Sequence, residues 1–64
     1  MEDPRFKLHD RVKPFKGSSI YIVDGMIYDE QEQEYVYQVH SLVSDTPKVY
    51  MEHELVFAGY NFMK

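Results

Sequence analysis

Short runs of β-branched and aromatic residues, separated by polar turns, run along the whole chain and predict an all-β fold. Residues 6–15 predict a first strand that ends at or soon after Pro14, because proline lacks the amide donor that a central strand needs. Residues 16–19 predict a loop from their glycine and serine content. A second strand is predicted over residues 20–28, and Gly25 inside it predicts a bulge or a sharp bend.

The middle of the chain predicts a hairpin with an acidic tip. Residues 29–34 carry four carboxylates and no apolar side chain, so we expect a solvated turn here and not a docked helix. Residues 35–42 predict the third strand. Because side chains alternate between the two faces of a strand, Tyr35, Tyr37 and Val39 should share one face. The other face then carries Val36, Gln38 and His40.

The last third of the chain completes the set of strands. After a turn cluster at 44–47, residues 48–51 predict a fourth strand and the polar residues 52–54 one tight helical turn. Residues 56–58 predict a fifth strand, and residues 60–64 a tail. Five short strands with a polar turn before the last one are typical of a small closed or half-closed barrel, because closure removes most exposed sheet edges. We therefore expect one domain that spans residues 1–64.

Length and composition narrow the classes of protein that this chain can represent. A chain of 64 residues has room for one small core and buries about 60% of the surface that its unfolded form exposes. The absence of cysteine excludes disulfides and cysteine-based zinc sites, and it fits a reducing cytoplasm. The first residues do not resemble a signal peptide, and no run approaches the roughly 20 apolar residues that span a bilayer. We expect a cytoplasmic protein without membrane contact.

Charge is unevenly distributed along the chain, which carries a formal net charge of -4. The beginning of the chain contains most of its cations, and these are the candidate contacts for nucleic acid: Arg5, Lys7, Arg11, Lys13 and Lys16. Carboxylates outnumber cations in the rest of the chain. Because neutralisation of phosphates supplies most of the non-specific affinity for nucleic acid, this balance predicts weak nucleic-acid binding at most.

No group of residues matches the pattern of a catalytic or metal site. The histidines His9, His40 and His53 fall on separate predicted elements, and their spacing matches no ligand motif. The serines lack the glycine elbow of a nucleophile, and residues 17–19 lack the glycine density of a phosphate-binding loop. A mobile hairpin tip cannot shield a carboxyl from water and so raise its pKa. We therefore expect no catalytic residue, no metal and no cofactor.

Aromatic residues are the strongest functional lead, because six tyrosines and four phenylalanines exceed what a core of this size needs. Tyrosine is enriched at protein interfaces, since its ring is apolar and its hydroxyl stays hydrated. The candidate partner-binding residues are four rings and three carboxylates of the tip: Tyr21, Tyr28, Tyr35, Tyr37, Glu30, Glu32 and Glu34. In the competing interpretation Tyr35 and Tyr37 are half-buried strand rings with their hydroxyls at the rim, and the tip serves solubility or steers a basic partner.

Several segments resemble SH3-like barrels of the KOW and Tudor type. Residues 6–14, Phe-Lys-Leu-His-Asp-Arg-Val-Lys-Pro, are similar to the opening of those barrels: an apolar residue, a Gly-Asp turn, a basic residue and a valine. His9 stands where the glycine is common. Residues 21–26 resemble the second strand, with a valine before a bending glycine, and residues 35–39 the third. Residues 49–55 resemble the closing element, which has an aromatic residue, an acidic turn and a returning leucine.

The resemblance covers nearly the whole chain and implies a five-stranded SH3-like barrel with a short helical turn before the last strand. It also implies that five side chains point inward: Val12, Val23, Val39, Tyr50 and Leu55. Short proteins of this kind are encoded by phages and prophages of Gram-positive bacteria. In KOW and Tudor modules, exposed rings contact peptides, modified side chains or nucleic-acid bases.

We therefore expect a non-catalytic protein-binding module that docks on a host or phage protein. Two alternatives stay open. One is a weak nucleic-acid-binding module of the KOW kind that uses the five cations at the beginning of the chain. The other is an acidic DNA mimic that inhibits a host nucleic-acid enzyme, with the carboxylates of residues 24–34 in place of phosphates.

Overall fold

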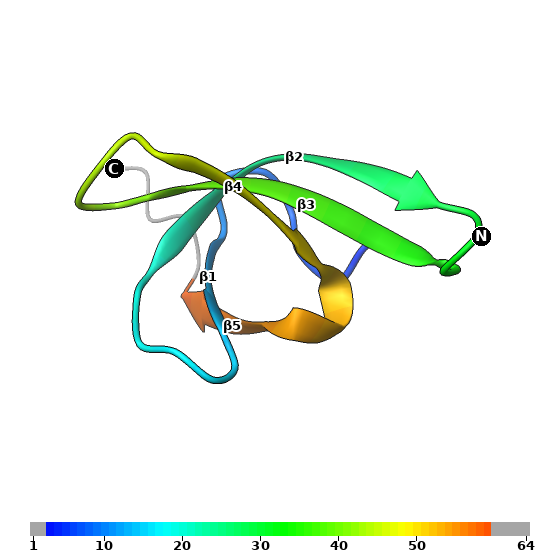
Figure 1. Ribbon diagram of the computed structural model, residues 1–64, viewed down its shortest axis with the longest axis horizontal. Coiled ribbons are helices and arrows are strands. Elements are labelled where there is room, and N and C mark those ends of the chain that lie inside the picture. The colour runs from blue at the N-terminus through cyan, green and yellow to red at the C-terminus, as the bar shows by residue number, and fades with distance from the viewer. Residues whose placement is uncertain (1–2, 60–64) are drawn as a thin grey trace.

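The computed structural model describes residues 3–59, which form five antiparallel strands in one sheet (Figure 1). The elements in chain order are β1 (Arg11–Pro14), β2 (Tyr21–Asp29), β3 (Glu34–Ser41), β4 (Pro47–Met51), the 3₁₀-helix η1 (Glu52–Glu54) and β5 (Leu55–Gly59). Across the sheet the strands follow the order β4-β3-β2-β1-β5. The all-β prediction is confirmed, and so is the helical turn before the last strand.

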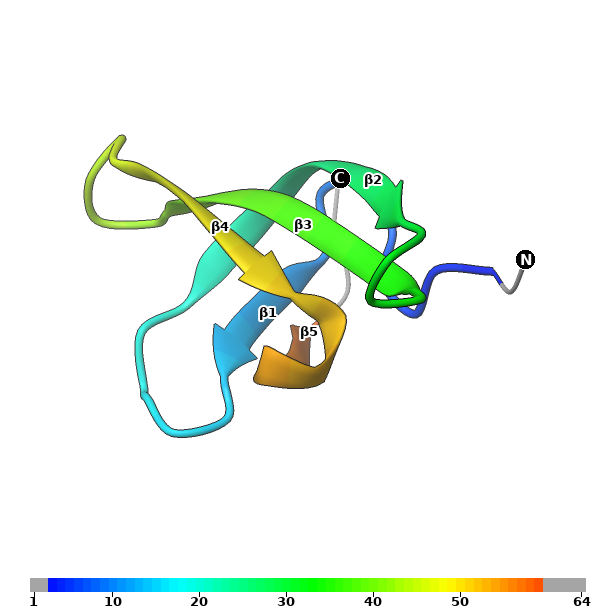
Figure 2. The same ribbon diagram turned by 45° about the vertical axis from the view of Figure 1, so that its right-hand side comes forward.

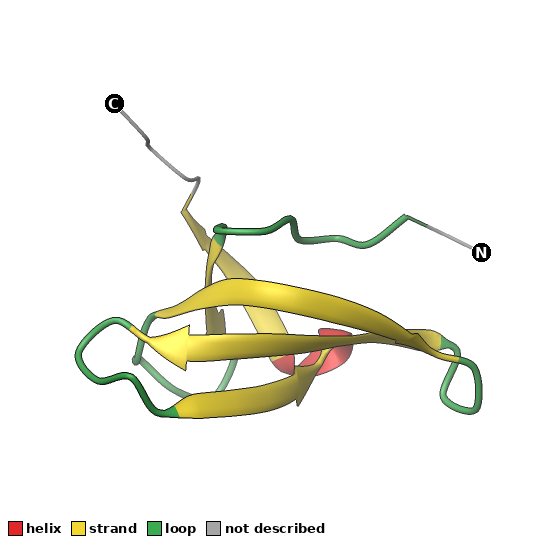
Figure 3. Ribbon diagram, turned by 90° about the horizontal axis from the view of Figure 1, so that it is seen from above, coloured by secondary structure: helices red, strands yellow, loops and turns green. Residues whose placement is uncertain are grey.

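The sheet curves around its interior, so that the two ends of the strand order bend toward the same side of the molecule (Figures 1 and 2). Seen from above, β2, β3 and β4 lie side by side and form a broad layer (Figure 3). The hairpin tip between β2 and β3 projects from one end of that layer. In the part of the chain described, no helix is long and apolar enough to cross a membrane. The tail expected at residues 60–64 lies outside the described residues.

The predicted first strand is wrong in its first half, because residues 6–10 form a turn and β1 begins only at Arg11. The side chain of Asp10 accepts a hydrogen bond from the Lys7 backbone N–H at 2.9 Å, and the Asp10 N–H donates to the Lys7 carbonyl at 3.0 Å. These bonds close the turn locally, and the His9 N–H joins it to β2 by donating to the Val23 carbonyl at 2.9 Å. His9 sits in this turn with a positive φ of 74°.

The bulge predicted at Gly25 is confirmed. Val23 pairs with Val39 and Gly25 pairs with Gln38, so Asp24 is the extra residue on β2. A Cβ atom on residue 25 would lie 3.1 Å from the side-chain oxygen of Gln38. Because glycine has no Cβ atom, it avoids this close contact with the Gln38 side chain.

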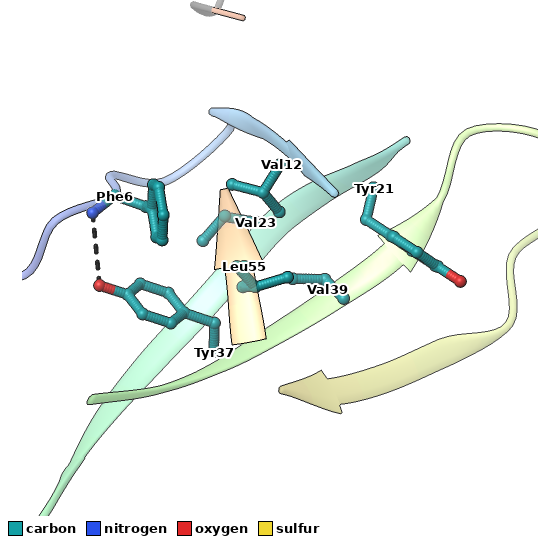
Figure 4. Close-up of a cluster of buried hydrophobic side chains, with 7 residues drawn as sticks. All are labelled: Phe6, Val12, Tyr21, Val23, Tyr37, Val39 and Leu55. Atoms are coloured by element: carbon teal, nitrogen blue, oxygen red, sulfur yellow. Dashed lines mark hydrogen bonds between the residues drawn. The ribbon is translucent and has the colours of Figure 1, made fainter. Parts of the chain in front are cut away.

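The core is a small cluster of seven side chains from four strands and the first turn: Phe6, Val12, Tyr21, Val23, Tyr37, Val39 and Leu55 (Figure 4). Four of the five residues expected to point inward are buried, whereas Tyr50 is half-buried and packs against the cluster from β4. The alternation predicted for β3 is confirmed, because Tyr37 and Val39 are buried while Gln38 between them is exposed. Burial of each such aliphatic side chain contributes about 1.5–3 kcal/mol.

The helix η1 returns the chain from β4 to the core. The Met51 backbone N–H donates to the side chain of Glu54 at 2.8 Å, which satisfies a donor at the start of the turn. The backbone then becomes extended again at Leu55, whose side chain enters the core.

Candidate binding surface

The outer face of the sheet, which points away from the core, carries aliphatic side chains on three neighbouring strands, exposed on β2 and β4 and half-buried on β3. Ile27 on β2 pairs with Val36 on β3, and Val49 on β4 pairs with Gln38 on β3. Ile27 is 61% exposed and Val49 is 62% exposed. Their neighbours Met26 and Tyr50 point to the other side and pack against the core. Side-chain alternation thus leaves one aliphatic face for the core and a second for solvent.

These aliphatic residues line a hollow of about 440 Å³ at the end of the face nearest the hairpin tip. Its lining consists of Ile27, Tyr28, Asp29, Glu30, Gln31, Val36, Gln38 and Val49. A second hollow of about 330 Å³ is lined by Asp24, Gln38, Val39, Pro47, Lys48 and Val49. Both hollows share Gln38 and Val49, so they adjoin. We call the combined depression the outer groove.

Carboxylates border the outer groove near the hairpin tip. The side chain of Asp29 accepts hydrogen bonds from the backbone N–H groups of Gln31 (3.0 Å) and Glu32 (3.3 Å), which folds the tip back on itself. Asp29 and Glu30 both line the groove. Glu30 and Glu32 are exposed, and neither forms an ion pair within residues 3–59. The tip therefore presents free negative charge beside an aliphatic floor.

A histidine–carboxylate pair lies at the opposite end of the groove. The bulge residue Asp24 contacts Nδ1 of His40 at 2.7 Å, and both side chains are partly exposed. Asp24 also lines the second hollow. The bulge at Gly25 thus directs a third carboxylate, paired with His40, to the other end of the groove.

Glu34 has a different role from the other tip carboxylates. Its Oε1 accepts the backbone N–H of His53 at 3.1 Å, and its Oε2 lies 2.9 Å from Nδ1 of the same residue. The Glu34 side chain is only 20% exposed. This residue therefore joins the start of β3 to η1, and the expectation that it belongs to a solvated tip is wrong.

The structure places two of the four candidate tyrosines in the core. Tyr37 is 0% exposed and Tyr21 is 6% exposed, so neither ring is available on the surface. The Tyr37 hydroxyl accepts the Phe6 backbone N–H at 3.3 Å and donates to the Glu52 carboxylate at 2.6 Å. Burial and the hydrogen bond to Glu52 raise the pKa of Tyr37 above its ordinary value. The ring of Tyr21 lies beside that of Tyr50, with 5.7 Å between the ring centres.

The other two tyrosines form a cross-strand pair. Tyr28 and Tyr35 are register partners, and their rings meet edge to face with 5.1 Å between centres. Both rings are half-buried, and Tyr35 also packs against the core. Of the four candidate tyrosines, Tyr28 is the one that lines the outer groove. The competing interpretation that Tyr35 and Tyr37 are half-buried therefore holds for Tyr35 and is wrong for Tyr37, which is fully buried.

The structure does not bring the five candidate cations together. Arg5 and Lys7 line a hollow of about 330 Å³ together with Phe6, Asp10 and Phe57. Lys13 lies on β1 and Lys16 in the loop that follows, and the Lys13 ammonium donates to the Gly17 carbonyl in that loop at 3.1 Å. The Lys16 ammonium lies 5.6 Å from the centre of the Phe15 ring. Arg11 also lies on β1, and in the sequence it falls between the pair Arg5 and Lys7 and the pair Lys13 and Lys16.

Within residues 3–59, no three histidine or carboxylate side chains are placed so that they could hold one metal ion. No protein-family model, no curated protein and no solved structure matches the chain.

The aliphatic floor of the groove was missed from the sequence. The signal was present, because residues 26–28, 35–37 and 49–51 are apolar at every position and so supply both faces of their strands.

Proposed function

We propose that this chain is a non-catalytic protein-binding module that holds a segment of a partner protein in the outer groove. The observation that carries the proposal is that exposed Ile27 and Val49 line one hollow together with half-buried Val36. A chain this small has few aliphatic side chains, and its core uses only a handful of them. Contiguous exposed apolar surface with a polar border is typical of an interaction site.

We also propose that the curved sheet is an SH3-like barrel. Support comes from the strand order β4-β3-β2-β1-β5, the bulge in β2, and the single 3₁₀ turn between β4 and β5. The sequence resemblance to small phage and prophage barrels supports the same fold. On that basis the partner would be a host or phage protein in the cytoplasm.

The chemistry of the groove favours a protein partner over nucleic acid. Its border carries Asp24, Asp29 and Glu30, which would repel phosphates. Its lining is mainly aliphatic with Tyr28 as the one aromatic ring among the described residues, whereas bases stack on aromatic rings. A DNA mimic is also less well supported, because three of the carboxylates in residues 24–34 are engaged within the chain. Asp24 pairs with His40, Asp29 folds the tip, and Glu34 pairs with His53.

A selection of peptides from a random displayed library tests this function. Peptides that bind the immobilised chain should lose about tenfold in affinity with Ile27→Ser or Val49→Ser, because a well-placed interface side chain contributes more than 1 kcal/mol. Val43→Ser is the matched control, since Val43 is 94% exposed in the β3–β4 loop and lines neither half of the groove. Selected peptides that bind all three variants as well as the parent would place the binding surface elsewhere and overturn the proposal.

A further inference from the structure

We propose that the outer groove selects a cationic segment, namely an extended stretch whose aliphatic residues alternate with lysine or arginine. This inference rests on the proposed function, because it names the class of partner that the same groove accepts. It adds a requirement for charge that an apolar groove alone does not impose.

The distribution of charge around the groove is the first support. Carboxylates border it at both ends, with Asp29 and Glu30 at the tip and Asp24 at the bulge. Among the described lining residues of the two hollows, Lys48 is the one cation. Its ammonium lies 6.0 Å from the centre of the Tyr21 ring, which belongs to the core side of the sheet. The tip end of the groove therefore presents net negative charge to a ligand, whereas Asp24 at the other end is paired with His40.

Unpaired carboxylates at the tip give this border its strength. Glu30 and Glu32 form no ion pair within residues 3–59, and both are exposed. An approaching lysine or arginine would gain from them without breaking an existing contact. Such complementarity accelerates association and discriminates against acidic partners, since like charges in contact are costly.

The shape of the groove favours an extended ligand. The two hollows follow each other along β3 and β4 and adjoin at Gln38 and Val49. In an extended segment alternate side chains point the same way, so aliphatic residues can enter the groove while the cations between them reach its border. Gln38 is exposed in the floor, and within residues 3–59 its side-chain amide has no hydrogen-bond partner. That amide is placed to bond the backbone of the ligand.

The same charges argue against a second copy of this chain as the occupant. A two-fold contact between two outer grooves would place identical acidic borders against each other. Each copy also has a formal net charge of -4, which adds repulsion. A cationic partner relieves this repulsion and a second copy increases it.

Three synthetic peptides of equal length, in which valine alternates with lysine, glutamine or glutamate, test the inference. Amide chemical shifts of the full chain report where each peptide binds. We expect the lysine peptide to shift the amides of Ile27, Val36, Gln38 and Val49 and to bind most tightly. Its affinity should fall several-fold between about 20 mM and about 300 mM NaCl, because salt screens exposed charges.

A pair of variants with the same loss of charge isolates the role of the tip. Glu30→Gln should weaken the lysine peptide about threefold, whereas Asp45→Asn, in the exposed β3–β4 loop, should leave its affinity unchanged. If both variants weaken the lysine peptide equally, the loss of affinity comes from the lower net charge and not from the position of Glu30, and the inference is overturned.

The remaining outcomes separate the inference from the proposed function. Equal binding of the three peptides in the groove would overturn the charge requirement and leave the docking function standing. Absence of groove shifts with every peptide would also overturn the inference, and the displayed-library selection would then decide the function independently. Groove shifts that depend on protein concentration without any peptide would identify a second copy as the occupant and overturn the inference.

Discussion

The hydroxyl of Tyr37 donates a 2.6 Å hydrogen bond to the carboxylate of Glu52, and this bond joins the middle of β3 to the helix η1. The same Glu52 oxygen accepts the Arg5 backbone N–H at 3.0 Å, while the Tyr37 oxygen accepts the Phe6 N–H. Phe6 also packs its ring edge to face against Tyr37, with 5.2 Å between centres. One buried hydroxyl thus connects the first turn, β3 and the turn before β5.

Removal of that hydroxyl should destabilise the fold. Tyr37→Phe keeps the ring but leaves the buried Phe6 N–H without its partner and removes one of the two hydrogen bonds to the Glu52 oxygen, so the free energy of unfolding should fall by about 1–3 kcal/mol. Urea denaturation followed by circular dichroism measures the change. Tyr28→Phe is the control, because the Tyr28 hydroxyl makes no hydrogen bond within residues 3–59, and its effect should stay below about 0.5 kcal/mol. Equal effects of the two variants would contradict this role.

Alkaline pH should weaken the fold through the same group. Burial, together with the hydrogen bond to Glu52, raises the pKa of Tyr37 in the folded protein above the value of about 10 that it has when unfolded. Above that pH the unfolded state releases the proton while the folded state keeps it, so the folded state binds more protons and loses stability as pH rises. The contribution is fully present below about pH 10 and declines above it.

The measurement is the free energy of unfolding as a function of pH for the parent and for Tyr37→Phe. The parent curve should fall more steeply above about pH 10, because the variant lacks this phenol. Tyr50 is present in both proteins, so it affects the two curves alike. Its pKa is also raised, mainly by a hydrogen bond with Tyr21. Identical alkaline slopes for the two proteins would show that Tyr37 ionises as readily in the folded state as in the unfolded one.

Glycine at position 9 should stabilise the protein. His9 has a φ of 74°, which lies in the left-handed region of backbone conformations. This conformation costs a residue with a Cβ atom about 1–2 kcal/mol of conformational energy, whereas glycine adopts it readily. His9→Gly keeps the backbone bond from residue 9 to the Val23 carbonyl, at 2.9 Å. We expect the free energy of unfolding to rise by about 0.5–1 kcal/mol in a thermal or urea melt. His9→Val should destabilise the protein, and a stabilising effect of valine would contradict the assigned backbone conformation.

Truncation of Leu55 should cost a large share of the stability. Leu55 is 1% exposed, and it is the core side chain that η1 returns to the interior. Leu55→Ala should lower the free energy of unfolding by about 2–5 kcal/mol, since it removes buried methylenes and leaves a cavity. Val43→Ala, at an exposed apolar position, should change it by less than about 0.5 kcal/mol. A melting temperature within a degree or two of the parent would place Leu55 outside the core.

The sequence by itself determined the elements and their order. Alternation over residues 35–41 predicted which side chains of β3 share a face, and Gly25 predicted the bulge in β2. The polar stretch before Leu55 predicted the helical turn. These features depend on interactions between residues a few positions apart, such as side-chain alternation, turn chemistry and the conformational freedom of glycine. Their signals are therefore present in short segments of the chain.

Only the tertiary structure decided which aromatic and acidic side chains are available to a partner. Phe6 is held in the core by its contact with Tyr37, which is 31 positions away in the sequence. Glu34 is held away from the hairpin tip by its hydrogen bond with His53, which is 19 positions away. Where a strand is apolar on both faces, as around Ile27, Val36 and Val49, alternation cannot say which face is inside. That choice depends on what packs against each face. As a result the candidate binding surface is the outer groove and not the strand face that carries Tyr35 and Tyr37.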